Sequence, residues 1–63
     1  MIKYTCVNKQ SMRVHTFLSI FDETTETYRL ANLDTGNLLA THFNNEEIID
    51  KYLSVLYEIK IKK

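Results

Sequence analysis

The sequence predicts one small α+β domain, residues 1–63, that is mainly β: a four-stranded antiparallel meander, one short helix and a closing C-terminal strand. Three observations predict this fold class. Apolar and polar residues alternate with a period of two through most of the first 43 residues, which is typical of strands with two different faces. The single glycine, Gly36, lies in a polar turn between two such stretches. After Phe43 the apolar spacing becomes helical, and the period of two returns near the C-terminus.

Two strands are expected in the first third of the chain. The first covers Ile2–Val7, and it places Ile2, Tyr4 and Cys6 on one face. The second covers Met12–Asp22 after a polar loop. One face of the second strand carries Val14, Thr16, Leu18 and Ile20, and the other carries Arg13, His15, Phe17, Ser19 and Phe21.

The turn from Leu33 to Asn37 sets the register of the next two strands. Asp34 followed two residues later by Gly36 suits a type I turn closed by a left-handed residue, a conformation that glycine adopts without a Cβ clash. We therefore expect a three-residue loop. The resulting cross-strand pairs are Leu33 with Asn37, Leu30 with Ala40 and Tyr28 with His42.

A short helix is expected over about Asn45–Leu53. Asn45 suits an N-cap, and acidic residues follow it in the first turn, where they oppose the positive end of the helix dipole. The closing strand covers Val55–Lys62, because alternation resumes there. One helix through to Tyr57 is the less favoured alternative. The strands form either an open sheet with the helix on one face or a small barrel like that of an SH3 domain.

Composition excludes several classes of function. Net charge is zero, with 8 basic and 8 acidic residues, which argues against a dedicated binder of phosphate backbones. No apolar run is long enough to span a membrane. The lone Cys6, with no apolar leader at the N-terminus, indicates a cytoplasmic protein. Abundant Lys, Ile, Asn, Thr and Tyr are typical of low-GC bacteria and their phages.

Nothing in the sequence indicates catalysis, a cofactor or a metal site. His15, His42 and Cys6 lack the spacing of a ligand set or a nucleophile–base pair. Cys6 is expected in the core, His42 beside Tyr28 on the inward face, and His15 exposed on the opposite face. A single glycine rules out a glycine-rich phosphate loop. We therefore expect a protein that is not an enzyme.

The register above gives the meander two apolar faces, of which one helix can cover only one. The expected core face consists of Val14, Leu18, Ile20, Tyr28, Leu30, Leu38 and Ala40. Phe17, Phe21, Leu39 and Phe43, with Arg29 among them, project from the other face, and exposed apolar patches usually mark partner surfaces. These five residues form the predicted partner-binding surface. The structural alternative is that a curled sheet encloses part of this set, or that the helix residues Ile48, Ile49, Tyr52 and Leu53 cover it.

Two functions fit these expectations. The first is a small protein-interaction module, of the kind a phage or mobile element uses to bind and inhibit a host protein, or one that forms a homodimer. The alternative is a nucleic-acid-binding barrel that stacks bases on Phe17 and Phe21. In that alternative the phosphate contacts come from Arg29, Lys60, Lys62 and Lys63.

Overall fold

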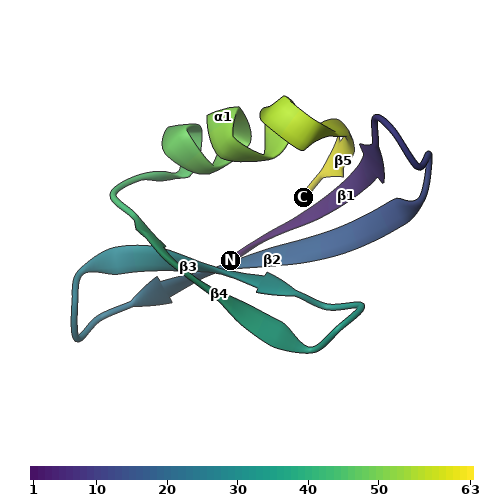
Figure 1. The fold of residues 1–63 in the computed structure, drawn as a ribbon. Helices are drawn as coiled ribbons and strands as arrows, with labels where there is room; N and C mark the ends of the chain where they lie inside the picture. Colours follow the sequence, from purple (N-terminus) through teal and green to yellow (C-terminus); the bar gives the residue numbers. More distant parts are fainter.

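The computed structural model of the chain describes residues 1–63 and is an open, five-stranded antiparallel sheet with one helix on one face (Figure 1). In chain order the elements are β1 (Ile2–Asn8), β2 (Val14–Asp22), β3 (Thr27–Asn32), β4 (Asn37–Phe43), α1 (Glu46–Leu56) and β5 (Tyr57–Lys62). The strand order in the sheet is β4-β3-β2-β1-β5. The predicted α+β fold class is confirmed, in its open-sheet form.

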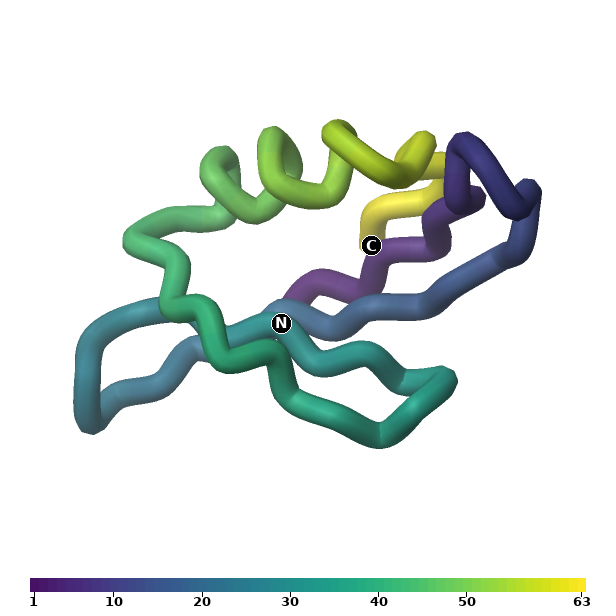
Figure 2. Tube along the Cα trace, viewed as in Figure 1, coloured from purple at the N-terminus to yellow at the C-terminus, as the bar shows by residue number.

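The helix carries the chain from one edge of the sheet to the other. Figure 2 shows the trace leaving β4, running above the sheet as α1 and returning as β5 beside β1. The two ends of the chain therefore lie together: the Lys63 N–H donates to the Lys3 carbonyl at 3.0 Å, and the Lys3 N–H donates back at 3.3 Å. Local hairpins build β1 to β4, whereas β5 is held by contacts that are distant in sequence.

On β2 and β4 the face that α1 covers is the opposite of the predicted core face, whereas on β3 Tyr28 and Leu30 lie on the covered face as predicted. The seven buried apolar residues are Tyr4, Cys6, Phe17, Leu30, Phe43, Ile49 and Leu53. Cys6 and Leu30 were expected in the core, and both are there. The expectation that Phe17 and Phe43 lie on an uncovered face is wrong, since each is only 3% exposed. The face turned away from α1, called the open face here, carries Val14, Leu18, Ile20, Ala31, Leu38 and Ile61.

A one-residue difference in the length of the β3–β4 loop explains the reversal on β4. The reversal on β2 has a separate cause in the β2–β3 register: Phe21 pairs with Tyr28 and Ser19 with Leu30, so Ile20 and Leu18 lie on the other face. Asn32 pairs with Asn37, so the β3–β4 loop has four residues, not the three predicted. The Asn32 side-chain oxygen accepts the N–H groups of Asp34 at 2.9 Å and Thr35 at 3.3 Å, which starts the turn one residue early. Because side chains alternate with a period of two, a slip of one residue relative to β3 moves the side chains of β4 to the other face. His42 is consequently exposed on the open face, opposite Arg29, and not beside Tyr28 as predicted.

The three hairpins share this loop design. Each begins with a side-chain oxygen that accepts a backbone N–H two residues on, from Asn8, Asp22 or Asn32. Four residues after each of these, the backbone has positive φ: 62° at Met12, 55° at Glu26 and 75° at Gly36. The left-handed conformation predicted for Gly36 is confirmed. At Met12 and Glu26 the Cβ atom makes the same conformation costly.

We expect Met12→Gly to stabilise the protein by about 1 kcal/mol, because glycine relieves the left-handed strain at a cost in chain entropy smaller than the strain itself. Gly36→Ala is the matched control. A Cβ at Gly36 meets nothing within 4 Å, so its expected loss of about 1 kcal/mol comes from φ alone. Urea unfolding midpoints at constant slope measure both changes. A Met12→Gly variant less stable than the parent protein would show that the left-handed conformation of Met12 is not strained.

The helix begins as predicted but ends later. Asn45 is the N-cap, and its side-chain oxygen accepts the Ile48 N–H at 3.0 Å. The last turn extends to Leu56, so the prediction that Val55 starts a strand is wrong. Lys9, in the β1–β2 loop, makes two hydrogen bonds to the end of the helix. Its side-chain ammonium donates to the Ser54 carbonyl at 2.6 Å, and its backbone N–H donates to the Leu56 carbonyl at 2.9 Å. A cation distant in sequence thus satisfies the helix C-terminus, which has no basic residue of its own.

Candidate functional site

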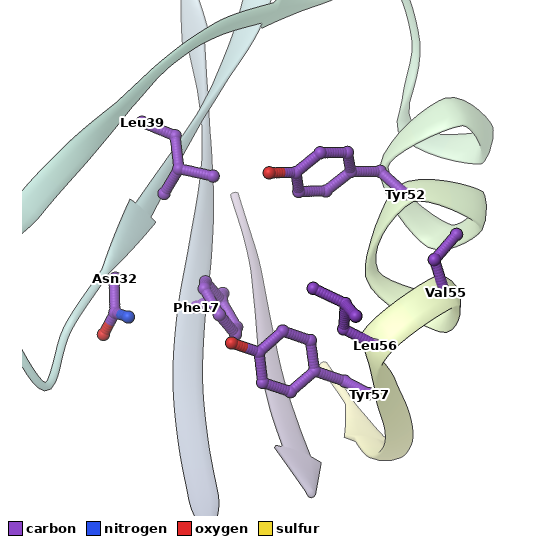
Figure 3. A pocket seen from close by; sticks show the side chains of 7 residues that line it. All are labelled: Phe17, Asn32, Leu39, Tyr52, Val55, Leu56 and Tyr57. Atoms are coloured by element: carbon purple, nitrogen blue, oxygen red, sulfur yellow. The ribbon is translucent and has the colours of Figure 1, made fainter. Parts of the chain in front are cut away.

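A hollow of about 380 Å³ opens between the C-terminal half of α1 and the sheet (Figure 3). We call it the α1–β4 groove. Six of its seven lining residues are hydrophobic, and none is charged. They are Phe17, Asn32, Leu39, Tyr52, Val55, Leu56 and Tyr57.

The groove exists because the apolar face of α1 is wider than the part of the sheet that it contacts. Ile49 and Leu53 point into the core and are fully buried. Tyr52, Val55 and Leu56 continue the same arc at spacings of three and four residues, on the side of the helix that overhangs β4. Val55 is 72% exposed and Leu56 is 61% exposed. An apolar row therefore faces solvent beside the hollow.

Aromatic pairs hold the floor and walls of the groove. Phe17 forms the floor from the central strand β2, and its ring meets that of Tyr57 edge to face, with centroids 5.3 Å apart. The Tyr52 ring meets that of the buried Phe43 in the same way at 5.2 Å. Each pair is worth about 1 kcal/mol beyond the area it buries. The groove is consequently preformed by side chains that are already packed.

Leu39 reaches the groove through an irregularity in β4. The register between β3 and β4 shifts between Arg29 and Ala31, where β4 contains extra residues. The Arg29 guanidinium donates to the Leu39 carbonyl at 2.9 Å and so satisfies a backbone group within the bulge. A bulge bends its strand and interrupts the edge, which opposes strand-to-strand pairing along β4. A partner that binds at this side of the molecule therefore contacts side chains and does not add a strand to β4.

A polar cluster fixes the other flank of α1. The Asp50 carboxylate accepts the Lys62 ammonium at 2.6 Å, and the same ammonium lies 5.9 Å from the centre of the Tyr4 ring. The Tyr4 hydroxyl is buried beside Asp50, and burial, followed by the Asp50 charge, raises the pKa of Tyr4 far above its ordinary value. These contacts tie the helix to β1 and β5 and leave only its β4 side open.

The structure brings together two of the five residues predicted to bind a partner. Phe17 and Leu39 line the groove. Phe43 supports it from beneath Tyr52 but is itself buried. Phe21 is 48% exposed but lies at the far end of β2, where its ring meets that of Tyr28 edge to face at 5.2 Å. Arg29 lies on the open face, on the other side of the sheet.

The cations of the nucleic-acid alternative do not form one cluster. Lys60 is paired with Glu58 at 2.9 Å and Lys62 with Asp50 at 2.6 Å. Arg29, on β3, is three strands away from β5, or about 14 Å across the sheet. Phe17, one of the two expected stacking platforms, is buried. The structure therefore offers no continuous basic track.

The remaining chemistry-bearing residues have structural partners. His42 Nδ1 is 2.9 Å from the Thr27 hydroxyl. His15, predicted to be exposed, is half-buried on the covered face, with its ring 5.4 Å from that of Tyr57. Burial raises the pKa of the Cys6 thiol. No group of three potential metal ligands comes together, and no helix has the length and apolar character needed to cross a bilayer.

Comparison with protein-family models, with curated proteins and with solved structures gives no significant match for this chain. The groove itself is therefore the basis for the function of this chain.

Sequence reasoning missed five residues of the groove, four of which lie at the α1–β5 junction. Val55, Leu56 and Tyr57 were assigned to a strand, which separated them from the helical stripe that includes Tyr52. Continuing the helical spacing from Ile48 and Tyr52 to Val55 and Leu56 would have revealed one apolar row. Asn32, the fifth, gives no such signal, because its place in the groove follows from the β3–β4 register.

Proposed function

We propose that this chain is a small, non-catalytic protein-interaction module that binds an apolar segment of another protein in the α1–β4 groove. One observation carries the proposal: Tyr52, Val55 and Leu56 form an exposed apolar row beside a preformed hollow. A contiguous apolar surface next to a concave site is typical of binding sites in proteins.

The chemistry of the lining favours an uncharged, apolar occupant. No lining side chain is charged, so a buried charge on the partner would lose its hydration without compensation. The hydroxyl groups of Tyr52 and Tyr57 reach into the groove (Figure 3), where they are suited to bond the backbone of a bound segment. A volume of about 380 Å³ lies near the lower end for ligand pockets. The hollow takes a few side chains, and the exposed row extends the contact.

The biological form that we propose is a cytoplasmic product of a phage or mobile element that inhibits a host protein by stoichiometric binding. A free, buried Cys6 suits a reducing compartment. The residue bias toward Lys, Ile, Asn and Thr suits an AT-rich genome. A short chain that offers an apolar groove suits an inhibitor that covers a contact surface of its target.

The direct test is selection from a random peptide library on the immobilised chain, with NMR mapping of the selected peptides. We expect uncharged, apolar peptides that shift the amide signals of Leu39, Tyr52 and Leu56. Val55→Asp, at an exposed position, is expected to weaken their binding at least tenfold, because it places a charge in an apolar contact. Ser54→Asp is the control, because it introduces the same charge at the neighbouring exposed residue, on the polar side of the helix. It is expected to change binding by less than twofold.

Two results would refute this function. In one, no peptide is enriched, although a small apolar dye binds the groove, which would make the groove a small-molecule site. In the other, selected peptides bind Val55→Asp and the parent protein equally well. Thermal unfolding followed by circular dichroism checks that both variants remain folded.

A further inference from the structure

Three hydrogen-bond donors of the α1–β4 groove have no partner within the chain. Two are the hydroxyl groups of Tyr52 and Tyr57, which point into the hollow (Figure 3). The third is the side-chain amide nitrogen of Asn32, on the opposite wall. None of the three takes part in a hydrogen bond of the folded protein. The hollow is therefore apolar in its walls but carries polar groups that are available to a ligand.

The turn between β3 and β4 fixes the orientation of the Asn32 donor. The Asn32 side-chain oxygen accepts the N–H groups of Asp34 at 2.9 Å and Thr35 at 3.3 Å. The opposite orientation of the amide would place its NH₂ group against these two donors. Its nitrogen is consequently turned toward Phe17 and the hollow (Figure 3). The hydrogen bonds that set the loop thus also aim a donor into the groove.

An occupant that covers these donors must supply acceptors, because a donor that loses its water and gains no partner costs free energy. The acceptors must be uncharged, since the lining has no charge to neutralise a buried one. Backbone carbonyls meet both conditions. The lining offers few acceptors in return, because the Asn32 oxygen already accepts two N–H groups and only the tyrosine hydroxyls remain. The groove therefore favours a segment with free carbonyls and few N–H groups.

One backbone conformation meets this requirement better than the others. An α-helix bonds its own carbonyls and leaves the three donors unpaired. A β-strand carries an N–H for every carbonyl and binds by adding to an edge, which the bulge in β4 opposes. A polyproline II segment has no internal hydrogen bonds, and each of its prolines has a carbonyl but no N–H. Proline-rich segments of this kind dock in grooves lined by aromatic rings.

We infer that the α1–β4 groove binds a proline-rich segment of its partner in the polyproline II conformation. The inference rests on the proposed function and names the class of its partner. The proline rings pack against the rings of Phe17, Tyr52 and Tyr57, and the three donors bond the carbonyls between them. Both surfaces are uncharged, so neither loses the hydration of a charged group on binding.

Titration of the full chain with two synthetic peptides, followed by amide chemical shifts, tests the inference. One peptide is an oligoproline that contains leucines, and in the other every proline is replaced by alanine. We expect the proline peptide to bind at least tenfold more tightly, because it is preorganised and brings no N–H groups from its prolines. The shifted signals are expected to include those of Leu39 and Tyr52.

Variants that remove one donor and keep the fold test the role of the donors. Tyr57→Phe retains the ring and is expected to weaken binding of the proline peptide by about threefold to tenfold. Tyr28→Phe is the matched control, at a half-buried tyrosine that packs on Phe21 outside the groove, and it should leave binding unchanged. Asn32→Asp keeps the acceptor oxygen of the turn but replaces the donor by a negative charge, so a loss of more than tenfold is expected. Urea unfolding checks that each variant is folded.

The outcomes separate this inference from the proposed function. An alanine peptide that binds as tightly as the proline peptide overturns the inference and leaves the proposed function intact. Binding of library-selected peptides without proline, together with no binding of the proline peptide, has the same meaning. Equal binding of the proline peptide to the parent protein, Tyr57→Phe and Asn32→Asp also overturns it, because the donors then do not hold the carbonyls. If no peptide of either kind and no selected peptide binds, the inference and the proposed function both fail.

Discussion

Replacing Phe17 with alanine is expected to destabilise the protein severely, whereas the same change at Phe21 is expected to be tolerated. Phe17 is 3% exposed and forms the contact between the central strand and the groove wall. Loss of a buried phenylalanine side chain costs about 3–5 kcal/mol. A domain of this length is stable by only about 3–9 kcal/mol. The cost of Phe17→Ala thus ranges from about a third of the stability to all of it.

Phe21 provides a matched control for Phe17. The two residues have the same side chain, lie on the same strand and point to the same side of the sheet. Phe21 is 48% exposed and packs mainly on Tyr28, so Phe21→Ala is expected to cost about 1–2 kcal/mol. Urea unfolding followed by circular dichroism, with amide dispersion by NMR, distinguishes the two variants. Equal stability of the two variants would show that α1 covers a different face from the one described.

Local sequence signals predicted the elements of this fold but not the face on which they pack. Strand alternation, the Asn45 cap and Gly36 each have a cause within a few residues, and each was confirmed. The side chains that β4 turns toward α1 depend on whether the β3–β4 loop starts at Leu33 or Asn32. The Asn32 side chain decides this by two hydrogen bonds that a turn pattern built on Asp and Gly does not include. An error of one residue then exchanged core and surface on β4. A shift of one residue between β2 and β3 did the same on β2, whereas Tyr28 and Leu30 of β3 kept the predicted face.

The site was harder to predict because its two halves meet only in three dimensions. Phe17 and Leu39 were candidates for the wrong reason, as members of a supposedly uncovered face. The helix row that completes the groove depends on the last turn of α1, and Lys9, more than forty residues earlier in the chain, caps that turn. Both alternation and helical spacing fit residues 55–57 equally well, so only the capping contact decides between them.

Stability is expected to fall steeply as the pH rises above about 9, because two buried groups on β1 resist ionisation. Burial raises the pKa of Cys6, and burial together with the Asp50 charge raises the pKa of Tyr4. Both residues are fully buried. In the unfolded chain these groups ionise at ordinary pKa values of about 8.5 and 10. The unfolded state therefore loses its protons first and gains in relative stability as the pH increases.

The sign and size of this effect follow from proton linkage. A raised folded-state pKa gives stability that is complete below the unfolded-state pKa and is lost as the pH rises toward the folded-state value. Each group lowers the free energy of unfolding by about 1.4 kcal/mol per pH unit in that window. We expect a slope of one proton above about pH 8.5 and of two protons above about pH 10, measured by urea unfolding across a pH series.

Substitution separates the contributions of the two groups. Cys6→Ala is expected to remove the first part of the alkaline slope and Tyr4→Phe the second, whatever their effects on stability at neutral pH. Tyr52→Phe, at a tyrosine that is 45% exposed, controls for the loss of a hydroxyl group in general. A parent protein whose stability is flat from pH 8 to 11 would contradict the burial of Tyr4 and Cys6. Since both lie beneath α1, it would also contradict the position of the helix on which the groove depends.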